Sequence, residues 1–420
     1  MSELLGGVDS ALFLAVTVPL ALWRPRAGLY AYLFLLLARP HDVVGALAAL
    51  RPMLVLGAVT VASASWRLRN RPTEGVEALR PFLPFLAAVA LSTLFGGEVS
   101  ASASAANDLL QSVLIAWLVV LLARTRVEIA AISWLAAASH TLLAAVLVCR
   151  VVLGGRLAGF RNLNYGGIGS ADPGQLGDEN SLASLLLLTL PLLWFLAAQS
   201  RVPWQRALAA LGVVVTVAGI VLSYSRAGLV GLGVAALCIV FAGPRPQRGA
   251  ALLAGAAALL LLLLPSAYIG FLVRTALEPG GQMRGRLVIW NVAGELLKER
   301  PLLGSGPGTF EIRYGRQIPG APRAGHNWIL EFLVELGGVG LLAFGWMMGR
   351  PLVRLYGLRG PPDRATDPWL AAVATGLGAS LAAHLAFHLF HSGALAAQAF
   401  VVLGLAVAVS RLGEEGTSRP

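Results

Sequence analysis

This 420-residue chain is poor in charged residues, which make up 13% of it, and it contains almost no lysine or cysteine. Lys298 is the only lysine, so the formal charge of +11 is an arginine excess that partly reflects residue usage. Cys149 and Cys238 have neither metal-ligand spacing nor that of a disulfide framework, and we interpret both as packing residues. A basic N-terminal region and a small-residue cleavage site are also missing. The first apolar run is therefore expected to be a membrane anchor.

What the chain has in excess is apolar sequence. Hydrophobic residues make up 57% of it, and the mean hydropathy is +0.75. Because a backbone in lipid must satisfy its own hydrogen bonds, we predict an all-α, polytopic transmembrane helix bundle of about 12–13 spans. It forms a single membrane domain over residues 1–420, with one long periplasmic loop, 273–325, that contains an interfacial helix. The expected spans are 8–23, 27–38, 44–66, 82–95, 109–123, 129–150, 181–199, 205–222, 227–242, 249–272, 326–348, 368–388 and 392–410.

Most arginines lie in short connections beside the spans, at 67–71, 124–126, 201–206, 245–248 and 350–364. The positive-inside rule assigns these connections, and the C-terminus, to the cytoplasm. This topology explains the basic charge, so nucleic-acid binding is not indicated. The side of the N-terminus stays open, because the arginines around 24–26 and 39 compete for the inner face.

Arg226 departs from this pattern, since it follows an apolar span at the predicted outer face. Beside the hydroxyl of Ser225, its guanidinium suits a diphosphate through paired, charge-assisted hydrogen bonds. The alternative is contact with a lipid headgroup.

A second basic group lies at Arg284 and Arg286, where an amphipathic stretch containing Trp290 begins. Its apolar spacing of three or four predicts a helix along the membrane interface, with Arg284 and Arg286 at its N-terminal, anion-attracting end. The alternative is an interfacial helix with basic anchors and no ligand.

His326 and Asn327 stand where the long loop becomes a span. The helix dipole opposes protonation of His326, which would keep its imidazole available as a general base; the alternative is a polar helix cap. Asn327, Glu331 and Glu335 share one helical stripe, and carboxylates within a span indicate a functional surface.

Several other residues receive structural interpretations. Gly304, Gly306 and Gly308 lack the lysine and strand context of a nucleotide-binding loop, and we expect them to make tight turns. Glycines 337, 338 and 340 are expected to let a helix approach its neighbour closely. His384, His388 and His391 recur at helical spacing without carboxylate partners. We expect them to pack or to line a cavity, with no metal site.

Taken together, these motifs resemble the O-antigen ligase and O-antigen polymerase superfamily of bacterial envelope proteins. The matching pieces are 225–228, Arg286 with Trp290, Pro301 with 304–306 and Phe310, and 326–327 leading to 335–337 and Gly340. Residues 39–42 and 178–180 also resemble the exosortase-associated O-glycosylation ligase branch, although Glu179 stands where that branch usually has asparagine.

The resemblance implies a membrane glycosyltransferase that moves a glycan from a polyprenyl (undecaprenyl) diphosphate carrier to an acceptor hydroxyl. The expected acceptor is a lipid, a glycan or a protein, at the periplasmic face of the bacterial inner membrane among membrane lipids. The transfer would be inverting and metal-independent, with no cofactor. Arg226, Arg286 and Arg284 would bind the diphosphate and His326 would act as the base. Ser225, Trp290, Asn327, Glu331 and Glu335 would support them.

Alternatives stay open from sequence. An O-antigen or exopolysaccharide polymerase uses the same donor chemistry with another acceptor. A transporter or flippase for a lipid-linked anionic substrate would need ionisable residues near the midplane of the membrane, whereas these gather at one surface. A silent scaffold of an envelope assembly is the third possibility.

Overall fold

In the computed structural model, the described residues are 2–40, 51–152, 179–223, 225–242, 270, 280–318, 323–358 and 367–417. Within these ranges the regular structure is helical and contains no strand, which confirms the predicted fold class. The helices are α1 (Ser2–Trp23), α2 (Pro25–Ala38), α5 (Pro52–Leu68), α6 (Pro72–Leu79), the 3-10 helix η1 (Arg80–Phe82), α7 (Leu83–Phe95), α8 (Val99–Leu122), α9 (Arg126–Val152), α10 (Glu179–Gln199), α11 (Pro203–Leu222), α12 (Arg226–Ala242), α15 (Gly280–Glu299), α16 (Phe310–Gln317), α17 (Trp328–Gly357), α18 (Pro368–His388) and α19 (Ala397–Thr417).

The described ranges contain eight helices that are long and apolar enough to cross a membrane, together with four shorter apolar helices. These coincide with the predicted spans, except that 249–272 falls almost wholly outside the described residues and the start of 44–66 does as well. Large apolar side chains remain exposed on them, among them Phe241 at 79% and Leu342 at 77%. Since a water-soluble surface would not carry so many, lipid is their solvent, and the chain is a multi-pass membrane protein.

The bundle is organised around three buried helices, α10, α18 and α19, which pack on one another and on α8 and α12. Small residues allow this packing. A Cβ on Gly376 of α18 would lie 2.9 Å from the Cα of Leu192 in α10, and one on Gly404 of α19 would lie 2.9 Å from the carbonyl oxygen of Ala116 in α8. Close backbone approach of this kind replaces the hydrophobic driving force that lipid does not supply.

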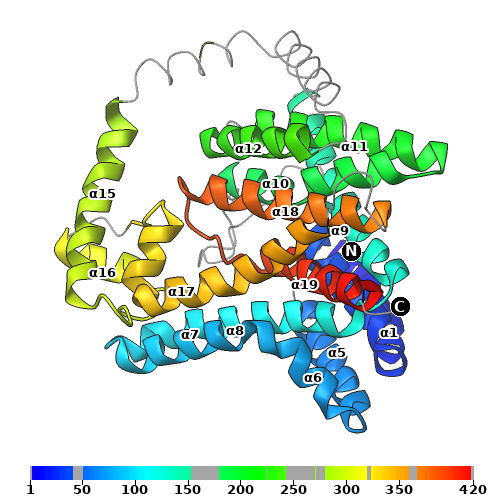
Figure 1. Cartoon of the computed structure of the whole chain (residues 1–420), viewed down its shortest axis with the longest axis horizontal. Coiled ribbons are helices and arrows are strands. Elements are labelled where there is room, and N and C mark those ends of the chain that lie inside the picture. Colours follow the sequence, from blue (N-terminus) through cyan, green and yellow to red (C-terminus); the bar gives the residue numbers. More distant parts are fainter. Residues whose placement is uncertain are drawn as a thin grey trace.

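Arginines of two of these connections, 124–126 and 350–364, form ion pairs in the described part of the chain. Arg124 forms an ion pair with Glu74 at 2.8 Å, Arg126 with Asp367, and Arg354 with Glu414 at 2.9 Å. In Figure 1, α15 stands apart from these contacts and runs steeply across the opposite end of the long helices. That crosswise position suits the interfacial helix predicted from the sequence.

Helix α17 is discontinuous. Gly337 has φ 67° and ψ −172°, which breaks the helix within a span. The turn at 301–306 packs into the break. Ser305 N donates to the Val334 carbonyl at 2.9 Å and Gly306 N to the Glu335 carbonyl at 2.9 Å. In return, the amides of residues 338 and 339 donate to the carbonyls of residues 301 and 302, at 2.8 and 3.1 Å. Loop and helix thus satisfy each other's backbone groups.

This break corrects one prediction and confirms another. Gly337 was expected to let α17 approach a neighbouring helix, but a Cβ there would meet the carbonyl oxygen of Leu302 at 2.2 Å. What approaches so closely is the turn at 301–306. Gly304, Gly306 and Gly308 have φ of 70°, 107° and 72°, and so make the predicted tight turns.

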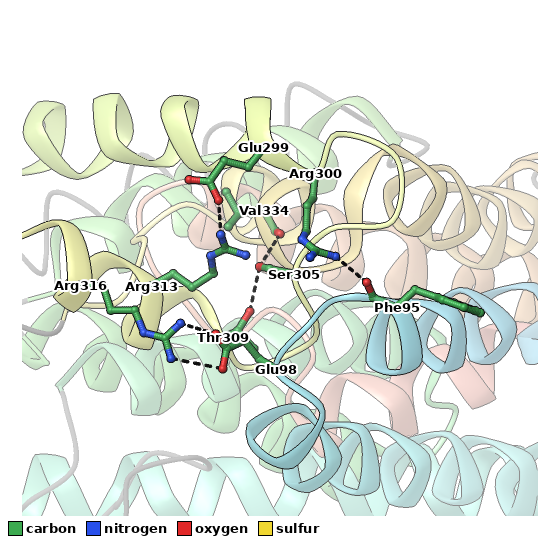
Figure 2. Close-up of polar contacts among 9 residues, drawn as sticks. All are labelled: Phe95, Glu98, Glu299, Arg300, Ser305, Thr309, Arg313, Arg316 and Val334. Atoms are coloured by element: carbon green, nitrogen blue, oxygen red, sulfur yellow. Dashed lines mark hydrogen bonds and ion pairs between the residues drawn. The ribbon is translucent and has the colours of Figure 1, made fainter.

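Two arginines, Arg300 and Arg316, bind the loop on either side of the turn at 301–306 to the region between α7 and α8 (Figure 2). Arg300 donates to the Phe95 carbonyl at the end of α7, and Arg316 of α16 forms a two-point ion pair with Glu98. Glu98 lies in the short connection between α7 and α8, so these contacts fix the long loop to the same end of both helices.

Candidate functional site

Arg226 is the first residue of α12, and Ser225 fixes the start of that helix. The Ser225 hydroxyl accepts from Gly228 N at 3.0 Å, as an N-cap does, and donates to Oδ1 of Asn180 in α10 at 2.6 Å. The hydroxyl is therefore engaged within the protein. Through these two hydrogen bonds, Ser225 fixes the backbone of Arg226 at the start of α12, next to α10.

Arg286 lies on α15 and reaches the turn between α18 and α19. Its Nη2 donates to the Phe390 carbonyl at 3.1 Å, and the guanidinium carbon lies 6.0 Å from the centre of the Phe390 ring. Burial lowers the pKa of the Arg286 guanidinium, and the charge of Arg226 lowers it further. The two arginines are thus close enough to repel each other, and a shared anion would relieve that repulsion.

The start of the helix that carries Arg284 differs from the prediction. Helix α15 begins at Gly280, because Gln282 and Met283 are good helix formers and extend it upstream. The expected N-terminal end at residues 284–286 was therefore wrong, and the free first-turn amides belong to earlier residues. The side chain of Arg284 lies outside what the structure describes.

His326 contacts the same turn that Arg286 reaches. Its backbone is left-handed, with φ 49°, and its amide donates to Ser392 Oγ at 3.1 Å. The imidazole stacks on that of His391, with centroids 6.1 Å apart. We name residues 390–392 the 390–392 turn. It joins Arg286 through Phe390 and His326 through His391 and Ser392.

Three predicted supporting residues fix the chain on either side of His326. Trp290 Nε1 donates to the Gly325 carbonyl at 3.3 Å. Asn327 is the N-cap of α17, and its Oδ1 accepts from two amides of the first turn at 3.0 and 3.2 Å. Glu331 accepts from Gly325 N at 2.8 Å and from the Ser392 hydroxyl. A left-handed histidine needs such support, because its conformation carries a backbone cost.

Glu335 does not join the arginines. Its carboxylate accepts from Phe310 N at 3.1 Å, and its backbone carbonyl accepts from Ser92 Oγ at 2.6 Å. With Glu331 it lines a separate cavity of about 460 Å³. The two glutamates predicted on one face of α17 therefore have different roles. Glu331 holds the residues next to His326, whereas Glu335 binds the loop at 304–310, here called the glycine loop, to α17.

The later histidines are packed into the bundle. His384 and His388 are almost fully buried. His384 Nε2 lies 3.2 Å from the Ala394 carbonyl, and His388 Nε2 lies 3.2 Å from Ser184 Oγ of α10. His388 Nδ1 lies 3.3 Å from the His391 carbonyl, so these contacts anchor the 390–392 turn to the core.

The assembled site thus has two neighbouring guanidinium groups, one of them bound to the 390–392 turn, and an imidazole on the same turn. Comparison with family models gives one match: residues 211–345, about a third of the chain, are similar to the O-antigen ligase family. The matched segment contains Arg226, Arg286 and His326 and ends beyond the break in α17. A search of curated proteins found no match.

The match supports a membrane glycosyltransferase of the O-antigen ligase or polymerase type. Two contributions to the candidate site were not predicted from sequence. Asn180 holds Ser225, and Phe390 and Ser392 connect Arg286 with His326. These contacts join residues 45 to 104 positions apart in the chain, so no spacing rule could have found them.

Proposed function

We propose that this protein transfers a glycan from a polyprenyl diphosphate carrier to an acceptor hydroxyl, in the manner of an O-antigen ligase. One observation carries the proposal: Arg286 donates to the Phe390 carbonyl of the 390–392 turn, and Ser392 of that turn accepts from the His326 amide. The charge of Arg226 also acts on Arg286. Paired guanidinium groups bind phosphate oxygens in planar, two-point geometry. A diphosphate bridging them would leave its sugar beside the imidazole.

The chemistry is a single displacement. The acceptor oxygen attacks the anomeric carbon and forms the new glycosidic bond while the carbon–oxygen bond to the diphosphate breaks. The electron pair leaves with polyprenyl diphosphate, and the hydroxyl proton passes to His326. One displacement inverts the anomeric configuration. Arg226 and Arg286 stabilise the charge that grows on the leaving group, so the transfer is metal-independent.

The orientation follows from the distribution of charge. The ion pairs of Arg124 and Arg354, from two of the arginine-rich connections, lie toward the end of the bundle opposite α15. If that end faces the cytoplasm of a bacterial inner membrane, the site faces the periplasm. Labelling of single cysteines placed at Arg206 and at Glu98 from the two sides of intact cells tests this. Periplasmic labelling at position 206 would reverse the orientation.

The decisive assay uses the full chain in liposomes with a polyprenyl diphosphate glycan and a panel of acceptors, and measures release of polyprenyl diphosphate. Arg226→Gln and Arg286→Gln are each expected to lower kcat/KM about 10²–10³-fold. Arg206→Gln is the matched control, because Arg206 lies at the far end of α11, exposed and bound to the Ser200 carbonyl. Equal activity in all three variants would refute the assignment of the arginines.

The products separate the remaining alternatives. Glycan found on a lipid or protein acceptor supports the ligase. Elongated glycan that stays on the carrier lipid would make the protein a polymerase. Movement of the lipid-linked glycan across the bilayer, without release of polyprenyl diphosphate, would make it a flippase.

Binding is tested without turnover by thermal unfolding. Removing one of two repelling charges should leave ligand-free Arg226→Gln at least as stable as the wild type. The same variant should lose the stabilisation that polyprenyl diphosphate gives to the wild type. A variant that keeps the full stabilisation would show that Arg226 does not contact the diphosphate.

A further inference from the structure

A second cavity, of about 680 Å³, lies where α1 joins α2, and its walls also come from α5, α6 and α8. It is not lined by Arg226, Arg286 or His326, so it is separate from the candidate site. In Figure 1, α1, α5 and α6 lie on the far side of the bundle from α15, which carries Arg286. The proposed glycan transfer makes no use of this cavity.

The charged lining of the cavity is almost entirely basic. It consists of five arginines and one glutamate, namely Arg24, Arg26, Arg67, Arg71, Arg124 and Glu74. Glu74 forms ion pairs with Arg71 and Arg124, at 3.3 and 2.8 Å. Arg26 forms an ion pair with Glu128 at 2.8 Å. Five guanidinium groups thus face two carboxylates, and three positive charges remain uncompensated.

Arg24 and Arg67 are the two arginines of this cavity that form no ion pair within the described residues. Arg67 Nη2 donates to the carbonyl of Trp23, the last residue of α1, and so holds the end of α1 against α5. Ser63 Oγ donates to the adjacent Leu22 carbonyl at 3.0 Å. The guanidinium carbon of Arg24 lies 4.6 Å from the centre of the Trp23 ring. The protein therefore positions both arginines while their charges stay available to an anion.

The surroundings of the cavity indicate that this anion belongs to a membrane lipid. Trp23 and Trp66, near the ends of α1 and α5, are 67% and 70% exposed, and tryptophans at span ends mark the headgroup level of a bilayer. The uncharged lining is mostly apolar and includes Leu68, Leu121 and Leu122. An amphiphile with a phosphate head uses both parts of this lining, whereas a soluble anion would use only the arginines. Basic pockets between spans at the cytoplasmic face bind anionic lipid headgroups.

We propose that this cavity binds the phosphate headgroup of an anionic phospholipid, with Arg24 and Arg67 donating to the phosphate oxygens. The acyl chains would lie along exposed apolar side chains of α1, such as Leu22. The cavity adjoins the connections 67–71 and 124–126, so the lipid belongs to the leaflet that the positive-inside rule makes cytoplasmic. This inference goes beyond the proposed glycan transfer and does not depend on it.

Thermal unfolding of the full-length protein in mixed micelles tests the proposal, with phosphatidylglycerol titrated into a phosphatidylcholine background. The melting temperature of the wild type should rise with phosphatidylglycerol and reach a plateau. Arg24→Gln and Arg67→Gln should each weaken the apparent affinity about five-fold, the value of one arginine near an anionic headgroup. Arg24→Gln puts folding at little risk, because this guanidinium packs on an exposed ring and forms no ion pair within the described residues.

Arg69→Gln is the matched control, because Arg69 is exposed, lies 4.6 Å from the centre of the Trp66 ring and does not line the cavity. It should keep the wild-type affinity within two-fold. If it loses as much affinity as Arg24→Gln, diffuse attraction to an anionic surface explains the effect and the site is refuted.

Two further ligands separate this cavity from other phosphate sites. Stabilisation by inorganic phosphate that disappears in Arg24→Gln would assign the cavity to a soluble anion and overturn the lipid. The stabilisation by polyprenyl diphosphate should persist in Arg24→Gln, because the diphosphate is expected at Arg226 and Arg286. Its loss would assign the cavity to the carrier lipid instead, whereas failure of the glycan transfer assay alone would leave the phospholipid site standing.

Discussion

Replacing Gly337 by alanine should detach the glycine loop from α17. Gly337 has φ 67° and ψ −172°, a region that is essentially restricted to glycine and costs other residues about 1–3 kcal/mol. The new Cβ would also lie 2.2 Å from the Leu302 carbonyl oxygen, so the turn at 301–306 must move. Four backbone hydrogen bonds join the turn to the break, each worth about 0.5–1.5 kcal/mol. Loss of two brings the expected destabilisation to about 2–6 kcal/mol.

Gly345→Ala is the matched control, because it lies in the same helix and a Cβ there meets no atom within 4 Å. It should be neutral or stabilising by up to about 1 kcal/mol, through helix propensity. Thermal unfolding in nanodiscs measures both variants. Hydrogen exchange at the amides of residues 305, 306, 338 and 339 should accelerate in Gly337→Ala alone. If Gly337→Ala melts no lower than Gly345→Ala, the break is not held by the contacts described.

Three further predictions concern the supports of the site. In Glu331→Gln, the amide side chain cannot accept equally well from Gly325 N and from the Ser392 hydroxyl, so the rate of glycan transfer should fall about ten-fold or more. The thermal stabilisation by polyprenyl diphosphate should persist, and its loss would contradict a positioning role. Ser225→Ala should lower the free energy of unfolding by about 1 kcal/mol, because the helix cap is lost, and should weaken diphosphate binding. Ser225→Asn should retain most of the stability, because asparagine also caps helices. Equal losses of stability in the two variants would exclude capping. Hydrogen bonding to Arg316 lowers the pKa of Glu98, so this pair stabilises the fold above the ordinary carboxyl pKa of 4.5 and less as pH falls below it. Melting curves of wild type and Glu98→Gln should therefore converge in acid, and a constant gap would contradict the ion pair.

The sequence predicted the helices well because lipid imposes one requirement, an apolar run of sufficient length, that can be read locally. Arg226 was proposed from an equally local signal, since it lies on the predicted outer face, where the positive-inside rule does not call for arginine. His326 was equally visible, because it marks the change from a polar loop to an apolar span. Each of these signals lies within a few residues of its own position.

The rest of the site depends on contacts between distant segments. Nothing near Phe390 indicates that its carbonyl accepts from Arg286, and nothing near Asn180 indicates Ser225. The break at Gly337 was missed for a related reason. Adjacent glycines in an apolar helix usually mean close helix packing, and only the position of the turn at 301–306 reveals that backbone pairing is the cause.

The interrupted span also has a consequence for biogenesis. The first half of α17 has unpaired carbonyls at its end, and the second half has unpaired amides at its beginning, until the turn at 301–306 reaches them. That turn is synthesised before α17, so its carbonyls and amides are already outside the translocon when the helix enters the bilayer. The segment from Pro301 to Val339 should therefore insert as one unit, and a nascent chain lacking the turn should stall at this helix.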